Sequence, residues 1–124
     1  MRWLTCRAFV GLLMFDLRGF DHNFASLHRF VCNSKPTTRP SDADTPERVC
    51  EAVNQASVWY PKRVLCLQRS AVTTCLLRRY GVSASMVVGV QKVPFKAHAW
   101  SEVGGRPINE RREVQSIYRI WERC

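Results

Sequence analysis

The sequence predicts an α+β fold in which helices come first and an antiparallel sheet follows. Apolar residues recur at helical intervals in residues 3–30 and 47–79, and later stretches are rich in β-branched and aromatic residues. A pair of glycines separates two of these later stretches. With 124 residues, of which 46% are hydrophobic, the chain is expected to build one compact core.

Residues 1–35 are predicted to be a helical segment of two helices. Phe9, Leu13 and Leu17 share one stripe of the first helix, and Gly19 marks the break before the second. We expect this stripe to pack on the rest of the domain. The arginines of the polar face leave contact with a partner protein or a membrane open.

The apolar run near the start is predicted to be neither a signal peptide nor a membrane span. Arg2 and Arg7 precede it, as in a signal peptide, but Asp16 and Arg18 interrupt it and no small-residue cleavage site follows. The run is also shorter than the roughly 20 apolar residues that cross a bilayer. An amphipathic helix is the expected structure.

Residues 36–46 are predicted to be a linker because the stretch around them is rich in Pro, Ser, Thr and Asp. Residues 47–124 are assigned to the main domain. The helix after the linker is expected to have Thr45 as its N-cap and Pro46 at its first position, and to end before Pro61.

The next helix is expected to begin near residues 63–66 and to stop at Gly81. Its apolar stripe would face the core, with Gln68 and Arg78 among the outward residues. The stretches SMVVGV, AHAWSEV and SIYRIW then read as strands, and Gly104-Gly105 predicts a hairpin after the second stretch.

The chain is strongly basic, with 19 Lys and Arg against 10 Asp and Glu and a formal charge of +9. This charge favours acidic partners. No basic run is interleaved with aromatic residues, and no zinc-finger or RRM signature is present, so we predict no nucleic-acid partner.

The cysteines are predicted to be reduced for the most part. None of them forms C-x-x-C, and neither they nor His22 and His28 have the short spacing of a zinc site. We expect most of them to be small buried residues in a reducing cytoplasm, with no metal and no cofactor. The six are Cys6, Cys32, Cys50, Cys66, Cys75 and Cys124.

Cys66 is the candidate nucleophile because it falls in the first turn of a predicted helix, where free N–H groups and the helix dipole stabilise a thiolate. Such a thiolate needs an imidazole to pass a proton to the leaving amine, and His98 is the histidine downstream of it. In a strand, His98, Trp100 and Glu102 share one face, and the small residues between them share the face under the helix.

A third group is expected to hold the imidazole in one tautomer. Glu102 is excluded because four strand residues span about 13 Å. A two-residue turn at the glycines places His98 opposite Arg111, whereas a three-residue loop centred on Gly104, or a bulge, places it opposite Glu110. We predict the second register, with Asn109 as the alternative acceptor.

Residues 60–110 contain, in order, Pro before a basic and apolar approach to "CL", then "RS", "RRYG", "GV", "PF", "HAW" and "G-x-P" followed by an acidic residue. This series resembles the microcin-processing leader peptidases of lasso-peptide biosynthesis, a family of transglutaminase-like cysteine peptidases. The resemblance covers about residues 52–118. It implies a papain- or transglutaminase-like fold with Cys66 as nucleophile and His98 as general base. Glu110 stands where the family usually has aspartate.

The implied function is cleavage of a ribosomally made precursor peptide between leader and core. The resemblance also implies three partners: the precursor, a small leader-binding protein, and an asparagine-synthetase-like cyclase that uses the freed core amine. Trp59, Tyr60 and Trp100 are candidate lining residues of the substrate site, or alternatively core residues. Two other functions stay open, namely a transglutaminase or amidase and a scaffold that presents peptides without catalysis.

Overall fold

The computed structural model describes residues 2–17, 24–33, 44–60, 66–91, 96–108, 114 and 118–124. The described helices are α1 (Arg2–Leu17), α2 (Phe24–Asn33), α3 (Thr45–Trp59) and α4 (Cys66–Arg79). The described strands are β1 (Ala84–Gln91), β2 (Lys96–Val103), β3 (Arg106–Ile108) and β4 (Arg119–Arg123). The predicted α+β order, helices before an antiparallel sheet, is confirmed.

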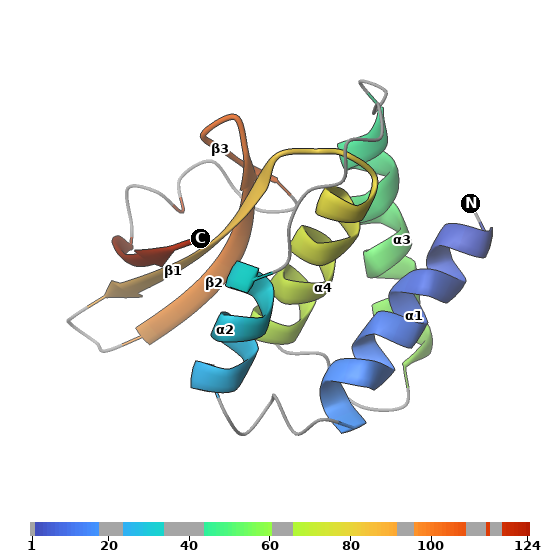
Figure 1. Cartoon of the computed structure of the whole chain (residues 1–124), viewed down its shortest axis with the longest axis horizontal. Helices are drawn as coiled ribbons and strands as arrows, with labels where there is room; N and C mark the ends of the chain where they lie inside the picture. The colour runs from blue at the N-terminus through green and yellow to red at the C-terminus, as the bar shows by residue number, and fades with distance from the viewer. Residues whose placement is uncertain are drawn as a thin grey trace.

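The sheet has the strand order β3-β2-β1-β4, and every neighbouring pair is antiparallel. The helices gather to one side of it, with α4 between the sheet and the pair α1 and α3 (Figure 1). Helix α4 contacts β1, β2 and the three other described helices. It is therefore the central helix of the fold.

Helix α4 ends as the sequence predicts. Gly81 has a φ of 84°, a left-handed conformation that glycine adopts without strain, and the N–H of Val82 donates to Leu77 O at 2.9 Å. The prediction that Gln68 and Arg78 point outward is wrong, since both are buried. Gln68 and Arg78 lie near the two ends of α4, where neighbouring elements cover them, and Gln68 donates to Leu12 O of α1 at 2.8 Å.

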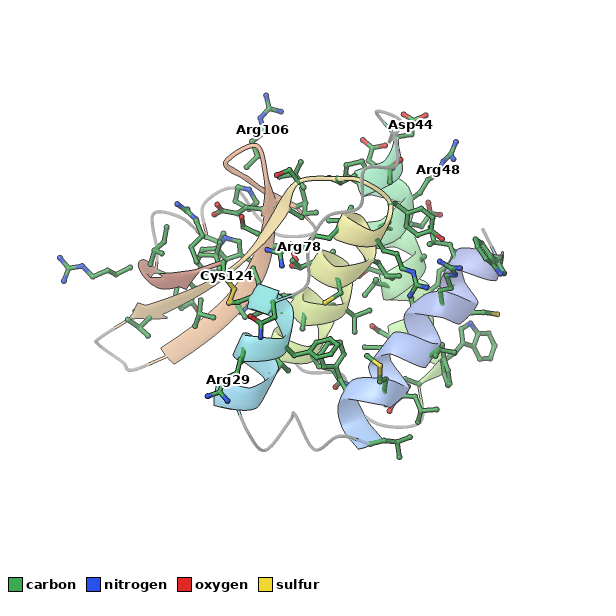
Figure 2. All side chains as sticks on the ribbon, viewed as in Figure 1. Arg29, Asp44, Arg48, Arg78, Arg106 and Cys124 are labelled. Carbon is green, nitrogen blue, oxygen red and sulfur yellow. A yellow bond between two sulfur atoms is a disulfide. The ribbon has the colours of Figure 1, made fainter. Side chains whose placement is uncertain are left out.

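Arg78 connects the ends of several elements. Its Nε–H donates to Ala84 O at 3.0 Å, one terminal N–H donates to Cys124 O at 2.7 Å, and another donates to Val31 O. Figure 2 shows the side chain running from α4 toward Cys124. Burial lowers the pKa of this guanidinium below its ordinary value.

The buried face of α1 differs from the predicted stripe. Ala8, Leu12 and Phe15 are in the core, whereas Leu13 and Leu17 are exposed. Because α1 is apolar on almost every side, periodicity does not identify its packed face. One core cluster combines buried residues of all four helices and β1, so residues 1–35 and 47–124 share it.

The predicted start of α3 differs from the structure by one residue, and the predictions for Gly19 and the linker fall largely outside the described residues. Asp44, not Thr45, is the N-cap of α3, and Pro46 occupies the second helical position, where it also removes no intrahelical hydrogen bond. Gly19 and most of the linker, residues 36–43, lie outside the described part of the chain.

The hairpin between β2 and β3 has a two-residue turn, because Val103 pairs with Arg106. Gly104 and Gly105 have φ values of 60° and 77°, as a type I′ turn requires at both central positions. The predicted three-residue loop is therefore wrong: two consecutive glycines satisfy the tighter turn.

Cys32 and Cys124 form a disulfide across 92 residues of sequence. The prediction of reduced cysteines is wrong for this pair. The end of α2 meets the end of β4 in the fold, and the spacing of cysteines along the sequence could not predict that contact. Cys6, Cys50 and Cys75 keep their thiols. Within the described ranges, no helix is long and apolar enough to cross a membrane.

Candidate active site

Helix α4 begins at Cys66, the predicted nucleophile. The residue therefore occupies the first helical turn, where backbone N–H groups lack intrahelical acceptors and favour negative charge. The side chain of Cys66 lies outside the described part of the structure. The position of its sulfur thus stays a prediction.

His98 lies on β2 and pairs with Gly89 of β1. Its half-buried imidazole contacts two aromatic rings: the centroids of Trp100 and Tyr118 lie 5.9 Å and 5.5 Å from it. The Trp100 and Tyr118 rings lie 6.2 Å apart. The three rings lie on the sheet face that carries Val87, and Trp100 and Tyr118 pack with Val87 and Val114 in one cluster.

Gly89 makes room for this cluster. A Cβ atom at this position would lie 2.7 Å from Tyr118 Cβ and 2.8 Å from Trp100 Cη2. These separations are shorter than a carbon–carbon contact allows. The absence of a side chain on the strand residue opposite His98 therefore permits the aromatic packing.

A pair of hydrogen bonds fixes α4 against β2. Ser101 Oγ donates to Ser70 O at 3.0 Å and lies 2.9 Å from Thr74 Oγ1. Ser70 is one helical turn, about 6 Å, after residue 66, and Ser101 is three strand residues, about 10 Å, after His98. Since α4 and β2 start toward the same end of the molecule (Figure 1), the bridge places the Cys66 turn and His98 at that end.

The two faces of β2 divide as the sequence predicts, with the small Ser101 facing α4. The same alternation puts His98 and Trp100 on the other face. The predicted contact between thiolate and imidazole would therefore have to form around the edge of β2, beyond the last described pair with β3, Ser101 with Ile108. Arg69 and Ser70 of α4 line a small cavity with Ile108 at this edge.

Glu110 and Asn109, the predicted acceptors, lie outside the described residues. The observed two-residue turn excludes the three-residue loop, whereas a bulge that would place Glu110 opposite His98 would fall after Ile108, outside the described residues. Their role in orienting the imidazole stays a prediction.

The structure does not bring the three candidate substrate residues together. Trp59, at the end of α3, is 78% exposed. Tyr60 is buried and packs edge to face on Phe9 of α1, with centroids 5.3 Å apart. Trp100 is buried in the cluster beside His98. Of the three, Trp59 has the exposed surface that a substrate contact needs.

Glu102 lies on the same face of β2 as His98, and the sequence reasoning assigned it no role. Its carboxylate is only 4% exposed; Oε2 accepts a hydrogen bond from Trp100 Nε1 at 2.9 Å, and Oε1 accepts one from Arg123 at 2.9 Å. The alternation of AHAWSE places Glu102 on the face of His98, which was the available signal. Among the residues that the structure describes, no three His, Cys, Asp or Glu side chains converge as a metal site would require.

The other thiols differ from Cys66 in their setting. Burial raises the pKa of the Cys50 thiol to about 11; the charge of Arg69 lowers it in part, and Glu47 raises it further. Cys6 is exposed on α1, one turn after the start of that helix.

A central helix that begins with cysteine and packs on an antiparallel sheet carrying histidine defines a papain-like arrangement. The model of the transglutaminase-like superfamily matches residues 7–122, and the chain belongs to this superfamily. The chain is also 40% identical over 45 residues to the microcin J25-processing protein McjB of Escherichia coli. This match covers 36% of the chain and 22% of McjB, well under two thirds of that relative. No solved structure matches the chain significantly.

The predicted resemblance to lasso-peptide leader peptidases is confirmed at the level of the superfamily and of this partial match.

Proposed function

We propose that this chain is a cysteine peptidase that removes the leader from a lasso-peptide precursor. Membership of the transglutaminase-like superfamily and the partial match to McjB support the proposal. The observation that carries it is the Ser101 bridge, which ties the second turn of the helix that begins at Cys66 to the strand that carries His98.

In this reaction the Cys66 thiolate attacks the carbonyl carbon of the last leader residue. Backbone N–H groups of the first turn of α4 stabilise the oxyanion. The tetrahedral intermediate collapses to a thioester as the core amine departs with a proton from the His98 imidazolium. Water then attacks the thioester, His98 accepts its proton, and the leader leaves as a carboxylate. Glu110, or Asn109 in its place, orients the imidazole.

The products define the proposed partners. The precursor peptide is the substrate, and a small leader-binding protein delivers it. The freed core amine is the group that an asparagine-synthetase-like cyclase would join to a side-chain carboxylate. We propose no cofactor, because a thiolate and an imidazole suffice for the hydrolysis.

We propose that the leader-binding protein docks in the groove between α1 and α4. This groove has a volume of about 680 Å³, and Val10 and Trp3 at its edge are exposed. Among the described residues that line it, Arg7, Arg78 and Arg79 are charged and none is acidic. An apolar surface with an acidic group on the partner complements this lining.

Deleting residues 1–35 would not test this docking, because Leu12 and Phe15 of α1 belong to the core. Val10→Asp is the sharper variant, and Ile120→Asp on the exposed strand β4 is its matched control. Loss of complex formation with Val10→Asp alone supports the groove. Equal binding by both variants would exclude it.

We propose a cytoplasmic location because the precursor is made there. The Cys32–Cys124 disulfide is a feature more common in oxidising compartments. The protein can be purified from cytoplasm in the presence of an alkylating agent. A thiol titration then tests whether Cys32 and Cys124 are joined by a disulfide in that compartment.

The deciding experiment incubates the protein, with its leader-binding partner, with the precursor peptide encoded beside it. Mass spectrometry should detect leader and core fragments with wild type and neither with Cys66→Ala or His98→Ala. Glu110→Ala should lower turnover less than His98→Ala. An amine adduct or a loss of ammonia would instead identify an acyl transferase, and an unchanged precursor with a folded wild type would favour a non-catalytic scaffold.

A further inference from the structure

Glu102 is a buried carboxylate on the sheet face of the candidate active site. It is 4% exposed, and its two oxygens accept hydrogen bonds from different partners, Trp100 Nε1 and Arg123, each at 2.9 Å. A buried carboxylate is costly unless it is paired and hydrogen-bonded. This carboxylate is both, and one of its partners belongs to the ring cluster around His98.

Trp100 contacts both Glu102 and the His98 imidazole. The indole ring is 2% exposed and lies against Gly89, with its centroid 5.9 Å from the His98 ring and 6.2 Å from the Tyr118 ring. A buried indole can turn about its side-chain bonds only if its N–H finds another acceptor. The bond to Glu102 thus selects one orientation of the ring that packs on His98.

Direct action of Glu102 on His98 is excluded by distance, since four strand residues separate the two by about 13 Å. Arg123 holds the carboxylate from β4, two strands away from β2, so the ion pair bridges across β1. The Arg123 side chain is 48% exposed, and the pair therefore serves to fix geometry more than to add stability.

We propose that Glu102 is a positioning residue that locks the Trp100 indole and thereby fixes the orientation of the His98 imidazole. The assignment rests on the proposed cysteine-peptidase function. Glu102 lies outside the predicted Cys-His-acid triad. It acts on His98 through the Trp100 ring and makes no bond to the imidazole itself.

The first test reads the geometry without any substrate. The indole N–H signal of Trp100, assigned in ¹H–¹⁵N spectra by its loss in Trp100→Phe, should exchange slowly with solvent in wild type. Glu102→Ala should speed its exchange at least 10-fold, whereas Glu102→Gln, which keeps an acceptor oxygen, should stay close to wild type. Equal exchange in Glu102→Ala and wild type would overturn the proposal.

The second test reads the consequence for the thiol. The rate of Cys66 alkylation by iodoacetamide is followed by mass spectrometry from pH 5 to pH 9, in a Cys6→Ser background. The Glu102→Ala profile should move toward that of His98→Ala, and Glu51→Ala, an exposed glutamate of α3, should keep the wild-type profile. A Glu102→Ala profile that coincides with wild type would refute the positioning role.

The third test uses cleavage of the precursor. Glu102→Ala should lower kcat about 10- to 100-fold with little change in KM, and adding it to Trp100→Phe should cause no further loss, because both remove one interaction. If Glu102→Ala fails to fold, Trp100→Phe alone decides: wild-type kcat and alkylation in that variant would overturn the proposal. If wild type cleaves no precursor, the peptidase function fails, and the exchange and alkylation tests still decide the role of Glu102.

Discussion

Replacing Gly89 by alanine should destabilise the protein and disturb the candidate site together. The added Cβ would lie 2.7 Å from Tyr118 Cβ and 2.8 Å from Trp100 Cη2. Carbon contacts are comfortable at about 3.5–4.0 Å, so the neighbours must retreat by about 1 Å. Tyr118 Cβ is fixed to its backbone and Trp100 is packed on all sides, so neither can yield by turning a flexible side-chain end.

Overpacking of this kind costs about 1–3 kcal/mol. Replacing a glycine in a strand interior lowers the conformational entropy of the unfolded chain, which stabilises the folded state by about 0.5–1 kcal/mol. Because neither neighbour can yield, the overpacking cost falls in the upper half of its range, about 2–3 kcal/mol, and we expect Gly89→Ala to lower the free energy of unfolding by about 1–2.5 kcal/mol. Urea denaturation followed by fluorescence measures this difference.

Gly11→Ala is the matched control. Its Cβ would meet Val72 Cγ1 at 3.2 Å, a milder contact with the end of a side chain, and alanine favours a helix interior by about 1 kcal/mol. The two effects should nearly cancel. If Gly89→Ala were as stable as wild type, the Trp100 and Tyr118 rings could not lie against the strand as described, and the packing around His98 would need revision.

Three further changes test other parts of the fold. Arg78→Met should lower the free energy of unfolding by about 3–5 kcal/mol, because two buried carbonyls and one partly buried carbonyl lose a charged donor. Exposed Arg79→Met should change it by less than about 1 kcal/mol in the same urea titration. Cys32→Ser should cost about 2–5 kcal/mol by opening a loop closed across 92 residues, and a reductant should affect wild type but not the variant. The raised pKa of Cys50, about 11 against 9.0, means that the folded state holds this proton more tightly, so its stabilising effect is complete below pH 9 and is lost as the pH rises through 11. Wild type should therefore lose more stability than Cys50→Ala between pH 8 and pH 10.5, and equal losses would contradict the shift.

The order of elements could be predicted because it depends on local patterns. Gly81 ends α4 and the glycine pair turns the hairpin, since each supplies a backbone conformation that other residues avoid. The start of α4 at Cys66 follows from the apolar stripe after Pro61. These signals act within a few residues, and the fold confirms them.

Features that depend on neighbours distant in the sequence could not be predicted in the same way. The packed face of α1 is set by α3 and α4, because the helix is apolar on nearly every side. Arg78 is buried because backbone carbonyls of other elements surround it, and periodicity treats every arginine as exposed. The register of β3 depended on a choice between two turns that both suit glycine, and the tighter one occurs.

Strand β4 supports the candidate site although it lies far from Cys66 and His98 in the sequence. Arg123 holds Glu102, and the next residue, Cys124, is fixed by its disulfide to Cys32, by Arg78 and by paired backbone bonds of 2.9 Å and 3.0 Å to Met86. Anchoring Cys124 therefore restricts the range of positions that Arg123 can take. If Glu102 positions Trp100 as proposed, opening the disulfide should loosen the Trp100 indole as well as destabilise the fold. A Cys32→Ser variant with weakened global stability but unchanged Trp100 exchange would separate the two effects and limit the disulfide to a structural role.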